Sequence, residues 1–139
     1  MRQTIDPHLE FDWRPVLWGA SVVVLFGLVV NLVFLKPAWF IPATLVGGGV
    51  AGARSGFYGQ SANNGAIAVL LGSVVLTPIL TYTRIMSLGI ESLGDSVFVF
   101  VGWAGAWLII VMMILVPHGY IGGVLVDFTR RKVGGPIGY

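Results

Sequence analysis

The chain has 139 residues, 56% of them hydrophobic and only 10% charged, and its mean hydropathy is +0.89. A soluble domain carries about 25% charged residues, so this sequence has too little polar surface to cover a water-soluble globule. A net charge of +2 without a basic stripe predicts no nucleic-acid partner, and the absence of cysteine excludes disulfides and thiolate chemistry. We therefore expect a small integral membrane protein.

The chain begins with a polar leader, residues 1–14, whose acidic residues do not fit a signal peptide. Arg14 ends this leader beside an aromatic residue, where a cation can contact lipid headgroups. Residues 15–35 follow as an uncharged run of about 21 residues, which matches the length needed to cross a hydrocarbon core of about 30 Å. Asn31 lies within this first predicted span and is expected to face a partner helix.

Two further spans are predicted after a short turn that contains two prolines. They cover residues 39–56 and residues 63–82. Pro78 lies inside the third span and is expected to bend that helix, because a proline removes one backbone hydrogen bond. A fourth span is predicted at residues 97–117.

Two segments outside these spans are also apolar in part. Residues 83–96 carry apolar residues on one helical face and acidic residues on the other, which predicts an interfacial amphipathic helix, with an irregular loop as the alternative. Residues 118–128 are about half a bilayer long as a helix. This short helical segment is expected to re-enter the membrane, to extend the fourth helix past Pro117 or to lie at the interface.

Small residues recur at four-residue spacing in the second, third and fourth spans. In lipid no hydrophobic force draws helices together, so their association depends on the close packing that small side chains permit. This spacing predicts helix-packing seams. The expected seam residues are Gly48, Gly52 and Gly56 in the second span, Gly65, Ala68 and Gly72 in the third, and Gly102 and Ala106 in the fourth.

Reactive side chains are too scattered to predict a catalytic or metal site. The two histidines, His8 and His118, stand alone, and no pair of carboxylates falls within a span. We predict no enzymatic activity, no cofactor and no metal. Polar residues inside the spans either line a narrow path for a solute or join helices by hydrogen bonds. They are Asn31, Thr44, Ser73, Thr77 and Thr81.

The basic residues predict how the chain is oriented. With four spans, six basic residues fall on the side of both termini and two, Lys36 and Arg84, on the other, which favours cytoplasmic termini. If the tail crossed the membrane, the count would become three against five and the amino terminus would lie outside. The tail ends in three basic residues that suit anionic lipid headgroups: Arg130, Arg131 and Lys132.

The sequence resembles a family of small glycine-rich integral membrane proteins common in halophilic archaea. The likeness is carried by residues 13–17 at the entry to the first span, and by residues 47–56, 64–72 and 121–123. The resemblance implies a four-span fold and no established activity, so no catalytic residue is carried over. The polar loop before the fourth span and the basic end of the tail depart from the family pattern.

These features together predict a membrane-embedded all-α bundle of four transmembrane helices over residues 15–129, with an interfacial helix, a short carboxy-terminal helical segment and a basic tail at residues 130–139. The expected function is that of a non-enzymatic helix-packing subunit, in a homo-oligomer or a larger assembly of a cell membrane or virion envelope. Its expected partners are membrane lipids and other membrane subunits. A small channel or transporter is the alternative.

Overall fold

The computed structural model describes residues 12–55 and 58–133, and every regular element within them is a helix. The all-α prediction is therefore confirmed. In chain order the elements are α1 (Trp13–Leu28), the π-helical turn η1 (Val29–Val33), the 3₁₀ turn η2 (Pro37–Trp39), α2 (Phe40–Ala53), α3 (Tyr58–Ser87), α4 (Leu93–Ile110), the π-helical turn η3 (Val111–Leu115) and α5 (Val116–Val133).

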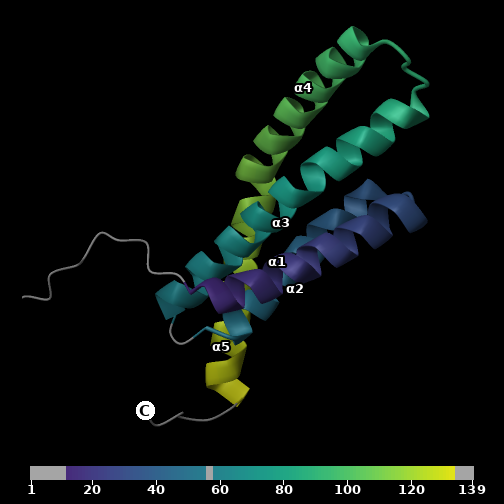
Figure 1. Ribbon diagram of the computed structural model, residues 1–139. Coiled ribbons are helices and arrows are strands. Elements are labelled where there is room, and N and C mark those ends of the chain that lie inside the picture. The colour runs from purple at the N-terminus through teal and green to yellow at the C-terminus, as the bar shows by residue number, and fades with distance from the viewer. Residues whose placement is uncertain (1–11, 56–57, 134–139) are drawn as a thin grey trace, which may run out of the picture.

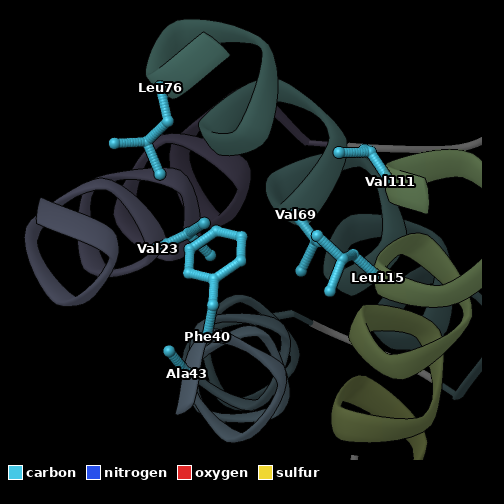
Figure 2. Close-up of a cluster of buried hydrophobic side chains, with 7 residues drawn as sticks. All are labelled: Val23, Phe40, Ala43, Val69, Leu76, Val111 and Leu115. Carbon is cyan, nitrogen blue, oxygen red and sulfur yellow. The ribbon is translucent and has the colours of Figure 1, made fainter. Parts of the chain in front are cut away.

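Helices α2 and α3 lie side by side between α1 and α5, and each of them contacts both. Figure 1 shows α5 crossing this group while α4 rises away from it. A cluster of buried hydrophobic side chains joins the helices, and Figure 2 shows the ring of Phe40 pointing from α2 into the space between Val23 of α1 and Val69 of α3. Trp107 closes this core from the α4 side, with its ring centroid 5.6 Å from that of Phe40.

The predicted fourth span and the apolar tail form one continuous helix. It runs from Leu93 to Lys132 through α4, η3 and α5 and is 40 residues long. Of the three arrangements predicted for the tail segment, the structure shows the extension past Pro117. A proline within a helix clashes with the carbonyl group four residues earlier. That carbonyl belongs to Met113 in η3, and the wider turn of a π-helix gives it room.

The interfacial helix predicted at residues 83–96 is wrong. These residues form the last turn of α3, a short connection and the first turn of α4. Gly89 adopts a left-handed conformation (φ 66°) just after α3 ends. The side chain of Ser92 accepts a hydrogen bond from the backbone N–H of Asp95 at 3.3 Å and caps the start of α4. These local stop and start signals outweigh the apolar periodicity of the segment.

Three helices in the described part of the chain are long and apolar enough to cross a membrane: Trp13–Val33, Gly59–Ser87 and Leu93–Lys132. Helix α2 is apolar but has only 14 residues, which gives it a length of about 21 Å against a hydrocarbon core of about 30 Å. The structure thus has the features of a membrane protein, while the crossing of all four predicted spans stays a prediction.

The two longest helices exceed the thickness of a bilayer core. Helix α3 has 30 residues, about 45 Å, and the helix from Leu93 to Lys132 has 40 residues, about 60 Å. Arg84, Glu91 and Asp95 lie at or beside the turn that joins them. Charged side chains are costly within hydrocarbon, so this composition suits a hairpin whose tip lies outside the membrane core.

Candidate functional site

Three helices touch backbone to backbone at Gly48 of α2, Gly65 of α3 and Gly119 of α5, which together we name the triple-glycine node. A Cβ atom added at Gly48 or at Gly65 would overlap the carbonyl oxygen of Gly119. A Cβ atom added at Gly119 would overlap the side chain of Val69 and the carbonyl oxygen of Gly65. Glycine is therefore the residue that fits at these three positions without displacing a helix.

A buried hydroxyl group links the same three helices one turn farther along. The hydroxyl of Ser61 in α3 lies 3.2 Å from the carbonyl oxygen of Gly52 in α2 and 2.8 Å from that of Gly123 in α5. Because a hydroxyl carries a single hydrogen, it is shared between the two acceptors. Gly52 and Gly123 are themselves in contact, since a Cβ atom added at Gly52 would lie 2.7 Å from the Cα atom of Gly123.

Helix α1 packs through a separate set of small residues. A Cβ atom added at Gly19 would lie 2.7 Å from the carbonyl oxygen of Gly47 and 2.8 Å from the Cβ atom of Ala68. A Cβ atom added at Gly72 would meet a valine of α1, also at 2.8 Å. Ala68 and Gly72 thus face α1, whereas Gly65 on the same helix faces α5.

The run of three glycines in α2 contacts neighbouring helices on both sides of α2. Successive residues of an α-helix point about 100° apart. Gly47 accordingly meets α1, and Gly48 meets α5 and α3. Gly49 meets Val126 of α5, which a Cβ atom at this position would approach to 3.0 Å. This run lets so short a helix pack closely against α1 on one side and α5 on the other.

The predicted seam residues divide into two groups. Five of them lie at contacts among α1, α2, α3 and α5: Gly48, Gly52, Gly65, Ala68 and Gly72. Gly56 lies outside the described residues. Gly102 and Ala106 are exposed on α4, and no atom of the described chain comes within 4 Å of a Cβ atom built on Gly102. The structure does not bring these two groups together.

The predicted intramembrane polar residues mainly bond to their own helices. Asn31, Thr44, Thr77 and Thr81 each donate a hydrogen bond to a backbone carbonyl three or four residues earlier, at 2.7–2.8 Å. The hydroxyl of Ser73 is buried without a hydrogen-bond partner among the described residues. None of these five residues lines either of two apolar grooves that border α2 in the described part of the chain.

A buried carboxylate lies at one end of the packed helices. The side chain of Asp127 in α5 is only 1% exposed, and each of its oxygens faces an arginine of the next turn. Arg130 Nη2 lies 2.8 Å from Oδ1, and Arg131 Nε lies 3.0 Å from Oδ2 in an ion pair without hydrogen-bond geometry. The two cations compensate a charge that is costly to bury alone.

Arg130 also closes the carboxy-terminal end of α2. Its Nη1 donates a hydrogen bond to the carbonyl oxygen of Ala53 at 2.9 Å, and its Nη2 donates to that of Ser55 at 3.1 Å. The last carbonyl groups of a helix lack partners within the helix and carry a partial negative charge. The guanidinium group satisfies both needs, and Asp127 holds it in the position to do so.

Two more hydrogen bonds connect α1 and α3 to this end. Asn64 of α3 donates through Nδ2 to the hydroxyl of Ser55 at 2.7 Å, and its Oδ1 accepts the backbone N–H of Asp12 at 3.0 Å. The start of α1, the end of α2, the start of α3 and the end of α5 therefore lie together. We name the group that joins them the Asp127 cluster: Asp12, Ser55, Asn64, Asp127 and Arg130.

The four residues predicted to contact lipid headgroups differ in their surroundings. Arg14, Arg131 and Lys132 are exposed, with the ammonium of Lys132 5.0 Å from the ring centroid of Phe128. The side chain of Arg130 is 30% exposed, and its guanidinium group is engaged by Asp127 and by α2. Arg130 thus acts first as a structural residue.

Asp127 is not among the site residues predicted from the sequence. A usable signal was present, because a lone carboxylate in an apolar segment is followed three and four residues later by Arg130 and Arg131, a spacing that places all three on one helical face. Within residues 12–55 and 58–133, no three His, Cys, Asp or Glu residues come together in a group that could hold a metal ion.

The fold and the site define an all-helical protein with helices of membrane-spanning length, held together by glycine contacts and one buried ion-pair cluster. Residues 13–127 match a family of unknown function (DUF5518), and the chain belongs to that family. The match begins with α1 and ends at the buried Asp127. The chain matches no curated protein and no solved structure. Membership of a family without an assigned function is thus confirmed, and the four-span and archaeal character of that family stays a prediction.

Replacing Gly48 with alanine is expected to lower the free energy of unfolding by about 1–3 kcal/mol, because the added methyl group displaces α2 from α5. The matched control is Gly59→Ala, which makes the same change at an open position of α3 and is expected to leave stability unchanged or slightly raised. Unfolding in mixed detergent micelles, followed by far-ultraviolet circular dichroism, measures both. Equal stability of the two variants would contradict the triple-glycine node.

Replacing Asp127 with asparagine is expected to cost about 1–3 kcal/mol of stability, since it leaves Arg130 and Arg131 without their anion while keeping the size of the side chain. Arg131→Gln is expected to cost less, because that side chain is 57% exposed and its ion pair is screened. Asp95→Asn at the exposed start of α4 is the control. A larger effect of Asp95→Asn than of Asp127→Asn in the same unfolding measurement would disprove the role of the cluster.

Proposed function

We propose that this chain is a non-enzymatic multi-pass membrane protein that acts as a helix-packing structural or accessory subunit, in a homo-oligomer or a larger membrane assembly. The observation that carries the proposal is the surface of α4. This helix has 18 residues, and none of them is buried by the described chain. Large apolar side chains cover it on several sides, including Phe98 at 81% and Val101 at 65% exposure. Such a surface requires lipid or another helix around it.

The small residues of α4 favour another helix over lipid alone. Gly102, Gly105 and Ala106 form a flat patch, and a Cβ atom at either glycine would meet no atom of the described chain within 4 Å. A glycine within a helix costs roughly 0.5–1 kcal/mol relative to alanine. Inside the bundle that cost is offset by close packing at the triple-glycine node. On α4 the equivalent contact has to come from a second chain.

The distribution of basic residues supports a membrane orientation with both termini in the cytoplasm. Arg14, Arg54, Arg130 and Arg131 lie near the Asp127 cluster, at the end of the bundle where α1 begins and α5 ends. Lys36 lies at the opposite end of α1. An excess of Lys and Arg marks cytoplasmic segments.

A small channel is the second candidate, and the side chains of α3 provide its support. Ser73, Thr77 and Thr81 lie on one face of that helix and are buried, and the Ser73 hydroxyl lacks a partner among the described residues. Because the two threonines already donate to carbonyls of their own helix, they offer a passing solute acceptor oxygens only. Solute flux into vesicles that contain the protein, beyond that into protein-free vesicles, would favour the channel.

The purified protein is expected to have a mass in mild detergent, after subtraction of bound detergent, greater than the 14.9 kDa of one chain. Gly102→Leu is expected to shift the population toward single chains, because the new side chain prevents close approach of a partner helix. Gly59→Leu is the matched control, since Gly59 is equally open but lies on α3. Light scattering coupled to size-exclusion chromatography reports the mass. A wild-type chain that is monomeric across detergents would contradict a homo-oligomer.

The proposed orientation is testable because the chain has no cysteine of its own. Glu91→Cys places a single thiol at the turn between α3 and α4, and Lys132→Cys places one at the end of α5. A membrane-impermeant maleimide applied to intact cells is expected to label the first variant at once and the second only after permeabilisation. The reverse pattern would place the termini outside.

A further inference from the structure

A groove of about 510 Å³ lies between the end of α1 and the start of α2. Its walls include Phe26, Val30, Phe34 and Trp39, and one charged residue, Lys36, also lines it. We propose that this groove binds one acyl chain of an anionic membrane phospholipid, with the lipid phosphate at Lys36. The proposal rests on the membrane location given under the proposed function and adds a defined lipid site to it.

The shape and lining of the groove fit an acyl chain. Its volume falls in the range of about 300–1,000 Å³ that is usual for small-molecule sites, and all of its lining residues except Lys36 are apolar. Val29 and Val30, which contribute to its wall, belong to the π-helical turn η1. Such turns depart from the regular helix and occur frequently at functional sites. Here η1 widens the end of α1 beside the groove.

The charge at the groove selects the headgroup. Lys36 follows Leu35, a non-glycine residue in the left-handed conformation (φ 52°), and its backbone N–H donates to the carbonyl oxygen of Val30 at 3.1 Å. This turn fixes Lys36 directly after the apolar helix, and no carboxylate of the described chain pairs with its ammonium group. Trp39, 63% exposed, lies beside it. Lysine and tryptophan at the end of an apolar helix match the interfacial layer where lipid phosphates lie.

A second groove provides an internal comparison. It has a volume of about 490 Å³ and lies between α2 and α5, with Leu45, Val50, Leu125 and Val126 among its lining residues. No charged residue lines it. The second groove can accept an acyl chain, but it has no cation to bind a lipid phosphate. We therefore expect the preference for anionic lipid to come from the groove at Lys36.

The test is native mass spectrometry of the protein released from nanodiscs that contain equal amounts of phosphatidylglycerol and phosphatidylcholine. One phosphatidylglycerol is expected to stay bound per chain, in preference to phosphatidylcholine. Lys36→Gln is expected to reduce that preference about fivefold, because a basic residue near anionic lipid contributes about that factor. Arg84→Gln removes another basic residue that does not line the groove, and it is expected to keep the preference.

Two matched bulky variants test the groove itself. Val29→Trp fills the groove at Lys36, so this variant is expected to lose the bound phosphatidylglycerol. Leu125→Trp fills the second groove, so this variant is expected to keep phosphatidylglycerol bound. Equal retention of both lipids, an unchanged preference in Lys36→Gln, or equal effects of the two tryptophan variants would overturn the proposal. So would a second protein chain bound without lipid and released by Val29→Trp. Failure of the membrane assignment itself would appear earlier, as protein that does not co-elute with the nanodiscs.

Discussion

The close approach of three helix backbones at Gly48, Gly65 and Gly119 is the contact on which the rest of the structure depends. Helices in lipid gain nothing from hiding apolar surface from water, so their association relies on contact area and hydrogen bonds. Because all three positions are glycine and carry no side chain, the backbones of α2, α3 and α5 touch directly. One turn away, the buried hydroxyl of Ser61 lies within hydrogen-bonding distance of carbonyl oxygens of α2 and α5. Close backbone contact of this kind suits helices that are long and apolar enough to cross a membrane.

This contact also positions the polar end of the bundle. Because Gly119 and Gly123 fix α5 against α2, the next two turns of α5 carry Asp127 and Arg130 to the end of α2, where carbonyl groups need donors. The triple-glycine node and the Asp127 cluster thus act together. The node sets the distance between α2 and α5, and Arg130 of the cluster donates hydrogen bonds to the backbone carbonyl groups at the end of α2.

The sequence predicts the seams better than it predicts their partners. Gly48 and Gly52 on α2 share a four-residue spacing and both lie against α5, but on α3 Gly65 lies against α5 while Ala68 and Gly72 lie against α1. The same spacing at Gly102 and Ala106 occurs on an exposed side of α4. Spacing specifies which residues share a side, and only the fold specifies what lies opposite. The helix through Pro117 and the missing interfacial helix have a similar cause, since a π-helical turn and the Ser92 cap act through backbone geometry that hydrophobic periodicity does not encode.

The two ends of the packed helices consequently differ in chemistry. At one end, charged and polar groups are paired with each other and with backbone carbonyls, so that end is largely satisfied within the chain. At the other end, Lys36 has no acidic partner in the described residues and borders an open apolar groove. Helix α4 packs on the core through Trp107 but leaves most of its surface uncovered. Unsatisfied charge and exposed apolar surface are the features that a second molecule can complement. The interactions of this protein are therefore expected along α4 and at the turn between α1 and α2, where its own chain leaves the most to be completed.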